Sequence, residues 1–366
     1  MESIIKNLMD MGWESALKLV IMWIIGGILI YLAIKKEMEP SLLLPMGFGA
    51  ILVNLPFADV EIIDLLFESG IANELFPLIL FIGIGAMIDF GPLLTNPKLM
   101  LFGAAAQFGI FFTLSMARLF GFALNDAASI AIIGAADGPT SIFVATELES
   151  SYIGAIIVAA YSYMALVPIV QPPVIKLITT EKERKIKMPY KGGDISKTTR
   201  ILFPIIVTII VGLVAPKAVV LVGFLMFGNL IRECGVLNSL SETAQNVLAN
   251  LVTILLGITV AAKMKAEDFL QLRTLLILGL GLVAFIFDTV GGVLFAKFMN
   301  LFSKNKVNPM IGAAGISAFP MSARVVHKMG LKEDPSNFLL MHSIGANVSG
   351  QIASVIAGGL ILNFVV

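Results

Sequence analysis

Two stretches of the sequence, AASIAIIGAADGPTSIFVATE at 127–147 and PMIGAAGISAFPMSARV at 309–325, decide the fold. Each is apolar over most of its length, but small residues and proline interrupt it in the middle, at GAADGPT (134–140) and at GAAGISAFP (312–320). Glycine and proline break a helix and free backbone carbonyls. At membrane depth, such irregular backbone is tolerated only where it is buried in protein or lines a polar cavity. We therefore interpret both stretches as re-entrant hairpins of a membrane protein.

The composition of the whole chain supports this interpretation. Of the 366 residues, 58% are apolar and 14% are charged, whereas soluble domains average about 45–50% apolar and about 25% charged residues. Basic and acidic residues balance at 25 each, so no charge field for nucleic acid is expected. One cysteine excludes an intrachain disulfide, and two histidines argue against a histidine-built metal centre. The sequence predicts an all-helical polytopic membrane protein.

The expected membrane crossings fall into two series, separated by the hydrophilic stretch TTEKERKIKMPYKGGDISKTTR at 179–200. A helix needs about 20 apolar residues to cross the hydrocarbon core. The expected crossings are 15–34, 41–55, 75–90, 98–120 and 151–178, and then 201–214, 216–230, 246–262, 274–299 and 337–364. The N-terminus lacks the basic start and the cleavage site of a signal peptide, so 15–34 is expected to be a genuine helix.

Loop charge predicts the orientation. The basic linker 179–200 is expected in the cytoplasm by the positive-inside rule. Loop 56–74 carries five acidic residues and no lysine or arginine, so we expect it outside, together with both termini. One loop opposes this orientation weakly, because it would place Lys263, Lys265 and Arg273 outside.

The two series resemble each other in order. Gly47-Phe48 corresponds to Gly223-Phe224, GIGAM at 83 corresponds to GITVA at 257, and GAAD at 134 corresponds to GAAG at 312, with offsets of 176, 174 and 178. Five crossings per half is an odd number, so the halves are predicted to be inverted repeats. We expect a first repeat at 1–178, a cytoplasmic linker at 179–200 and a second repeat at 201–366. The hairpin tips then meet near the midplane, where inverted-repeat transporters bind ions and substrates.

Asp137 is the main candidate for chemistry in the first hairpin. An ionisable group in an apolar stretch is costly in a membrane, and is by default a functional hypothesis. Its carboxylate, the carbonyls freed at Gly138-Pro139 and the Thr140 hydroxyl are the oxygen ligands that a hard cation such as sodium prefers. The alternative is that Asp137 caps the second half-helix, and the two roles are compatible.

The last crossing carries polar residues on one helical face. These are Ser343, Asn347, Gly350, Gln351 and Ser354. Serine and asparagine also hydrogen-bond between membrane helices, and for Ser343 this structural role is as plausible as function. For Asn347, between Gly345 and Gly350, we favour a cation ligand or gate.

The second hairpin ends at Arg324, a fixed charge expected on the cytoplasmic side. A guanidinium binds a carboxylate through two hydrogen bonds, so Arg324 is a candidate anchor for an anionic substrate. The alternative is an arginine that snorkels to the interface. Tyr163 interrupts 151–178, and its hydroxyl is either structural or a proton carrier. Asp288 is the second intramembrane acid, with a scaffold role as its alternative.

Three blocks together resemble one known family: GAADGPT (134–140), NPMIGAAGISAFPMSARVVHKMG (308–330) and NFLLMHSIGANVSGQIASVIAGG (337–359). They are similar to the beta subunit of the sodium-pumping biotin-dependent decarboxylases, which act on oxaloacetate, methylmalonyl-CoA or glutaconyl-CoA. The resemblance runs from about residue 15 to the C-terminus. It implies a trimeric, elevator-type core in a bacterial or archaeal cytoplasmic membrane, similar to citrate–sodium symporters.

The resemblance also implies the activity and the partners. Such a subunit accepts carboxybiotin from a biotin carrier protein, decarboxylates it and exports Na+, with consumption of a proton. A carboxyltransferase subunit and a small gamma/delta-type membrane subunit are the other implied partners.

The family's functional positions carry over onto matching residues. The implied assignments are catalysis by Arg324, Tyr163, Ser317 and Asp137, carboxybiotin binding by Arg324, Asn308 and Gly312, and Na+ binding by Asp137, Asn347 and Ser354.

A different function class is compatible with the same pattern. A stand-alone sodium-coupled organic-anion symporter of the elevator type would also use an inverted repeat and broken hairpins. Such a symporter would be expected to present more than one cationic anchor, whereas Arg324 is the one clear candidate at the hairpin. A passive scaffold would leave Asp137 and both breaks unexplained.

Overall fold

The computed structural model describes residues 12–56, 58–190 and 192–365, and all regular structure within these ranges is helical. The helices up to the hydrophilic stretch are α2 (Trp13–Lys36), α3 (Pro40–Val53), α4 (Glu61–Phe67), α5 (Leu75–Met87), α6 (Gly91–Thr95), α7 (Met100–Ala106), α8 (Phe108–Leu119), α9 (Leu124–Ala131), α10 (Gly138–Glu147) and α11 (Ile153–Ile178).

The remaining helices are α12 (Glu181–Arg184), α13 (Lys197–Val214), α14 (Val219–Glu233), α15 (Asn238–Glu242), α16 (Ala249–Val260), α17 (Ala266–Phe269), α18 (Leu272–Phe302), α19 (Met310–Ala313), α20 (Met321–Glu333) and α21 (Leu340–Val365). Short 3₁₀ segments are η2 (Pro97–Leu99), η3 (Ile132–Ala135), η4 (Pro216–Ala218) and η6 (Ala261–Lys263), and π-helical segments are η1 (Glu68–Ala72) and η5 (Thr243–Leu248).

The prediction of an all-helical polytopic membrane protein is confirmed. Within the described ranges, 7 helical segments are long and apolar enough to cross a membrane, or 8 if the bent pair Glu61–Ala72 and Leu75–Met87 is one span. All ten predicted crossings are helical, but three of these helices are too short to span a membrane by themselves. They are α3, α5 and α14. The N-terminus, predicted to lie outside the cell, belongs to residues that the structure does not describe.

One loop prediction is wrong. The acidic segment 56–74 was expected to be a loop, yet it contains α4 and η1, which continue toward α5 across a bend of 59°. Isoleucines and leucines between the acidic residues give α4 an apolar side. Ile63 and Phe67 are buried there, and that burial stabilises the helix despite its charge.

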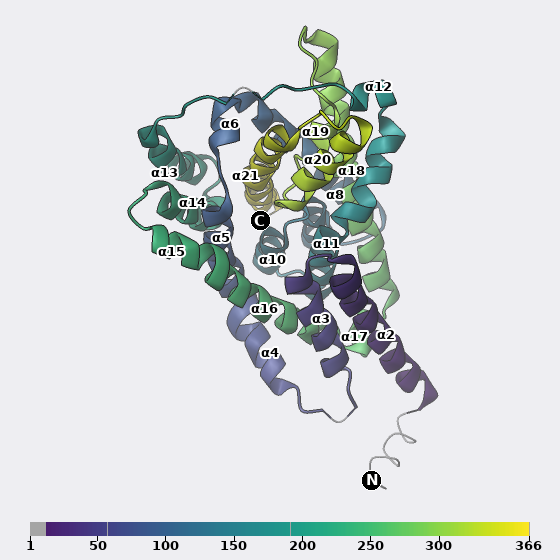
Figure 1. The fold of residues 1–366 in the computed structure, drawn as a ribbon. Helices are drawn as coiled ribbons and strands as arrows, with labels where there is room; N and C mark the ends of the chain where they lie inside the picture. The colour runs from purple at the N-terminus through teal and green to yellow at the C-terminus, as the bar shows by residue number, and fades with distance from the viewer. Residues whose placement is uncertain (1–11, 57, 191, 366) are drawn as a thin grey trace.

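The helices differ in how deeply they lie inside the protein. In the most apolar window of each span, 11% of the residues are buried in α13 and 17% in α2, but 67% in α21. Figure 1 shows α21 and α10 in the middle of the molecule, with α13 and α14 to one side and α11 and α18 to the other. The polar face of α21 therefore meets protein, whereas α2 and α13 expose apolar side chains as lipid-facing helices do.

Two asparagines form matching hydrogen bonds between the two halves of the chain. The Asn54 side chain, at the end of α3, donates to the carbonyl of Met264 beyond α16 at 2.8 Å. The Asn229 side chain, in α14, donates to the carbonyl of Ile88 beyond α5 at 2.9 Å. The two donors are 175 positions apart and the two acceptors 176, close to the offset of the repeated sequence motifs.

Candidate functional site

The two interrupted helices meet at their breaks. In the first, η3 ends at Ala135, Ala136 adopts a left-handed conformation with φ 51°, and Asp137 begins α10. In the second, α19 ends at Ala313 and α20 begins at Met321, so the residues between them are not helical. The backbone N–H of Ser317 donates to the carbonyl of Ala135 at 3.0 Å. The breaks that the sequence marks with glycine and proline are therefore in direct contact.

Asp137 lies at this contact and is buried, with 4% of its surface exposed. The hydroxyl of Thr140 donates to Oδ2 of Asp137 at 2.8 Å, and the hydroxyl of Ser354 donates to the same oxygen at 3.1 Å. The backbone N–H of Thr140 faces Oδ1 at 3.5 Å, so Asp137 also caps α10. Capping leaves Oδ1 only weakly bonded, and the carboxylate retains capacity for a further ligand.

The polar face of α21 supports the second break. Asn347 donates from Nδ2 to the carbonyl of Ile316 at 2.6 Å, and Gln351 donates to the carbonyl of Ser317. Among the described residues, Oδ1 of Asn347 and Oε1 of Gln351 are buried without a hydrogen-bond partner. A buried acceptor without a donor is costly. These orphaned oxygens are what a weakly held cation near Asp137 would use.

Ser317 and Gly312 have mainly structural contacts. The Ser317 hydroxyl donates to the carbonyl of Gly350 at 2.9 Å, which ties the second break to α21. A Cβ atom on Gly312 would lie 2.0 Å from the carbonyl oxygen of Gly292, so only glycine allows α19 to approach α18 this closely. Gly312 therefore positions the hairpin.

Asn308, the other residue predicted to bind carboxybiotin, holds the linker. Its side chain is fully buried, donates to the carbonyls of Arg184 at 2.7 Å and of Ile186 at 3.0 Å, and accepts from the N–H of Met310 at 3.1 Å. These bonds satisfy the amide. Asn308 is thus placed at the entry of the second hairpin, where it fastens the chain that connects the two halves.

Ion pairs join the same linker to the end of α20. Arg184 pairs with Glu333 at 2.7 Å, and Lys187 pairs with Asp334 at 3.1 Å. Hydrogen bonds from Ser336, together with the nearby Lys187 ammonium, lower the pKa of the partly exposed Asp334 carboxyl to about 2. That carboxylate is consequently charged at neutral pH, and the ion pair is present under ordinary conditions.

The structure separates two tyrosines that are close in sequence. The Tyr163 hydroxyl donates to the carbonyl of Leu278 in α18, so it is not part of the Asp137 cluster. Tyr161 packs its ring against Gly138, where an added Cβ would lie 2.2 Å from the ring. Its buried hydroxyl has no partner among the described residues. Sequence reasoning missed Tyr161, and no local sequence signal distinguishes it from Tyr163, because the contact with Gly138 is long-range.

Asp288 is buried at a second contact of the first hairpin. Its Oδ1 accepts from the N–H of Ile110 at 3.2 Å, and its Oδ2 has no partner among the described residues. An added Cβ on Gly134 would lie 2.6 Å from Oδ2. Asp288 therefore connects α8, α18 and the first hairpin. These contacts are those expected of a scaffold residue, the alternative given for Asp288 from the sequence.

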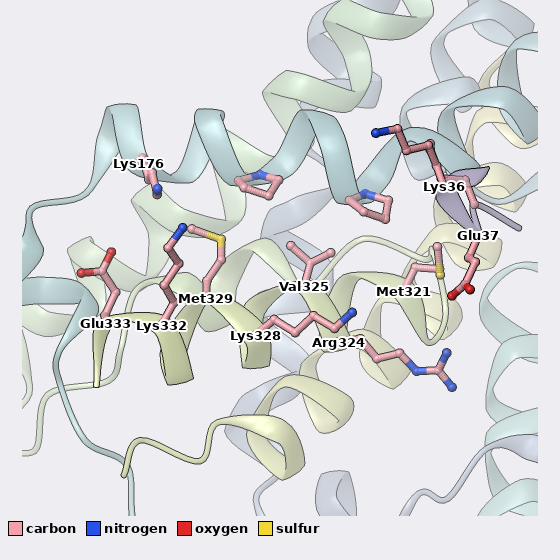
Figure 2. A pocket seen from close by; sticks show the side chains of 13 residues that line it. Lys36, Glu37, Lys176, Met321, Arg324, Val325, Lys328, Met329, Lys332 and Glu333 are labelled. Atoms are coloured by element: carbon pink, nitrogen blue, oxygen red, sulfur yellow. The ribbon is translucent and has the colours of Figure 1, made fainter. Parts of the chain in front are cut away.

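Arg324 lies apart from Asp137, in a groove of about 590 Å³ between α20, α11 and the end of α2. Figure 2 shows its guanidinium at the end of the groove near Glu37, whereas Val325 lies farther toward Met329. Pro168 and Pro172 form an apolar part of the opposite wall. Within the described residues, no hydrogen bond or ion pair joins Arg324 to Asp137. The site thus has a buried oxygen cluster and a separate, open cationic groove.

Comparison with known proteins identifies the family. Residues 18–365 match the family model of the Na+-transporting oxaloacetate decarboxylase beta subunit. The chain is 51% identical to the methylmalonyl-CoA decarboxylase subunit beta of Propionigenium modestum, over 94% of both chains. It is 51% identical to the glutaconyl-CoA decarboxylase subunit beta of Acidaminococcus fermentans, over 96% of this chain and 94% of that one. It is 46% identical to the oxaloacetate decarboxylase beta chain of Haemophilus ducreyi, over 100% of this chain and 99% of that one.

These relatives do not support the alternative of a stand-alone symporter. The chain therefore belongs to the family of beta subunits of Na+-transporting decarboxylases, as a multi-pass membrane subunit of a sodium-translocating decarboxylase.

Proposed function

We propose that this subunit decarboxylates carboxybiotin delivered by a biotin carrier, and that it couples the reaction to Na+ export and to consumption of a proton. The observation that carries the proposal is the contact between the two broken helices, where Asp137 meets the hydroxyls of Thr140 and Ser354. The Arg324 groove supplies the second requirement, a cationic binding place that a carrier can reach.

Sodium is bound in this proposal by Asp137, Asn347 and Ser354. The cluster combines one carboxylate with hydroxyl and amide oxygens, and hard cations prefer oxygen ligands. The described residues contain no group of three or more His, Cys, Asp or Glu side chains placed to hold a metal ion. A site with a single negative charge and neutral oxygens suits a monovalent ion that must also leave.

Arg324 anchors the anionic end of carboxybiotin in the groove. The groove residues fit carboxybiotin, because the Arg324 guanidinium can bind a carboxylate through two parallel hydrogen bonds. The groove wall at Pro168 and Pro172 is apolar, which suits the rest of the molecule. When bound, carboxybiotin supplies the carbamate that loses CO2. Asn308 and Gly312 act indirectly, since they position the hairpin that leads to Arg324.

The proton is linked to sodium through Asp137. A buried carboxylate binds either a proton or a cation well, because it carries one negative charge. Sodium arrival at Asp137 therefore displaces a proton, and a neighbouring hydroxyl relays it by accepting that proton while it gives its own onward to the decarboxylation that consumes it. Tyr161, which lies against Gly138 with an unpartnered hydroxyl, is better placed as a relay than Tyr163 or Ser317, whose hydroxyls are bonded to the carbonyls of Leu278 and Gly350.

We place this chemistry in two inverted repeats, 1–178 and 201–366, joined by a cytoplasmic linker at 179–200, with an elevator-type motion. The reciprocal bonds of Asn54 and Asn229 support the repeat, because a two-fold relation between the halves generates each bond from the other. Membership of the family supports a homotrimer, with a carboxyltransferase, a biotin carrier and a small gamma/delta-type subunit, in a bacterial or archaeal cytoplasmic membrane.

Reconstitution tests the function. The complex of this chain with its biotin-carrying partner is placed in sealed vesicles, and CO2 release and Na+ movement are measured together. We expect CO2 release to require Na+, and Na+ to cross the membrane only when carboxybiotin is consumed. Movement of Na+ without the carrier, driven by a gradient of an organic anion, would contradict the proposal and favour a symporter.

The two tyrosines give a paired prediction. Tyr161→Phe removes a hydroxyl that has no partner, so we expect unchanged thermal stability but about 10-fold slower Na+-dependent decarboxylation, or about 1.4 kcal/mol. Tyr163→Phe removes the hydrogen bond to Leu278, so we expect a loss of about 1 kcal/mol in stability and a smaller change in rate. Unfolding curves in detergent and initial rates measure both. A large loss of rate in Tyr163→Phe with little change in Tyr161→Phe would assign the proton relay to Tyr163 instead.

A further inference from the structure

We propose that a row of cations on α20 and α11 docks an acidic surface of the biotin-carrying partner. We call this row the basic stripe, and it consists of Arg324, Lys328 and Lys332 on α20 together with Lys176 on α11. The inference rests on the proposed function, and it adds a recognition surface to the place where the substrate enters.

The spacing of the three α20 residues aligns them. Positions 324, 328 and 332 are four residues apart, so they lie on one face of the helix and span about 12 Å along its axis. All three side chains are exposed. Figure 2 shows Lys328 and Lys332 following Arg324 along the groove, with Lys176 opposite Lys332. The stripe therefore runs along the groove from Lys332 to the guanidinium that we assign to the substrate.

The three lysines of the stripe have no ion-pair partner within the described part of the chain, whereas Arg324 lies near the carboxylates of Glu37 and Glu39. Two carboxylates line the same groove, and one of them, Glu333, is paired with Arg184 at 2.7 Å. No ion pair in the described residues involves Lys176, Lys328 or Lys332. Uncompensated charge of one sign in a groove attracts an oppositely charged partner and accelerates its association.

The shape of the surface favours a protein over a lipid. A lipid headgroup presents its negative charge over a short distance, whereas the stripe extends over about two helical turns. The substrate for Arg324 also arrives attached to a protein, so the surface around the groove entrance must accept that protein. An acidic face on the carrier, beside its biotinylated residue, complements the stripe in sign and length.

The experiment compares two forms of the same substrate. The double variant Lys328→Gln/Lys332→Gln, in the complete complex in vesicles of neutral lipid, is assayed with carrier-bound carboxybiotin and with free carboxybiotin. We expect the KM for the carrier-bound form to rise about 10-fold at low salt, because rim charges act mainly on association, with kcat little changed. The KM for the free form should change by less than about twofold.

Two controls accompany this variant. Lys182→Gln, at an exposed lysine of the linker outside the groove, should leave both KM values as in the wild type. Lys328→Arg/Lys332→Arg keeps the charge and should restore the KM for the carrier-bound form. Raising the salt concentration should increase that KM in the wild type and have a weaker effect in the glutamine variant.

Three results would overturn the docking proposal. The first is an equal rise in KM for both substrate forms, and the second is no rise for either. The third is a rise that occurs only in vesicles containing anionic lipid, which would assign the stripe to the membrane surface. A wild-type complex that fails to decarboxylate either form would instead contradict the proposed function, so the two failures are distinguishable.

Discussion

Replacing Asp137 by asparagine is expected to abolish Na+-dependent decarboxylation while leaving the protein folded. Asparagine is also a good N-cap, and its oxygen can accept the hydroxyls of Thr140 and Ser354 that Asp137 accepts now. The side-chain volume is kept, but the negative charge is lost and one of the two acceptor oxygens becomes an NH2 group, which cannot accept the Thr140 N–H that Oδ1 faces now. We expect the Na+ affinity to fall by at least about 100-fold, or about 2.7 kcal/mol, in a titration of the thermal stabilisation of the protein against Na+ concentration.

A second buried aspartate provides the matched control. Asp126, at the start of α9, accepts hydrogen bonds from Ser150 and Ser151 at 2.8 and 2.9 Å. An asparagine oxygen can accept both of these bonds, so Asp126→Asn should retain normal Na+ affinity. If Asp137→Asn also retained it, the sodium site would lie elsewhere, and Asp288 with its unpartnered oxygen would be the next candidate.

Lowering the pH should act in the same direction as removing the charge. Protons and sodium compete for the same carboxylate, so the Na+ concentration that gives half-maximal rate should rise as the pH falls. In Asp137→Asn, whose amide does not titrate, the residual Na+ binding measured by thermal stabilisation should not depend on pH in this way.

Replacing Arg324 by lysine is expected to weaken carboxybiotin use far more than Na+ binding. Lysine keeps the charge but loses the planar fork that makes two parallel hydrogen bonds with a carboxylate. A hydrogen bond to a charged group contributes about 1.5–3 kcal/mol, so the KM for carboxybiotin should rise about 10- to 100-fold. Unlike the effect of the α20 lysines, this rise should be the same for the free and carrier-bound forms.

The control for Arg324 is an arginine with a purely structural bond. Arg118 donates to the carbonyl of Phe122 at 2.8 Å, a bond that a lysine can also make, so Arg118→Lys should leave both KM values unchanged. Equal losses of carboxybiotin use and Na+ affinity in Arg324→Lys, or a loss of neither, would mean that Arg324 only snorkels. The substrate anchor would then have to be sought elsewhere.

Local sequence signals predicted the elements of the site well. Glycine and proline marked both breaks, and an acid in an apolar stretch marked Asp137, because these signals depend on residues within one helical turn. The polar face of α21 was visible for the same reason, since residues three or four apart share a face. The acidic segment at 56–74 was misjudged because its charge outweighed the buried Ile63 and Phe67 in the sequence pattern.

Residue roles that depend on the packing of helices were harder to predict from the sequence. Residues two apart on a helix point about 200° apart, so Tyr161 and Tyr163 face different neighbours, and only the position of Gly138 and Leu278 decides which tyrosine adjoins Asp137. The family resemblance implied that Asn308 and Gly312 share the carboxybiotin ligand of Arg324. In the structure their contacts are with the linker and with Gly292.

The sequence by itself determined the all-helical membrane class, the two broken helices, the acid between them and the family, because composition, periodicity and helix breakers are properties of neighbouring residues. Only the tertiary structure decided that Ala135 meets Ser317, that Ser354 bonds to Asp137 across 217 positions, and that Arg324 lies in a separate groove. Such contacts follow from the angles at which helices pack, and those angles depend on side chains from distant parts of the chain.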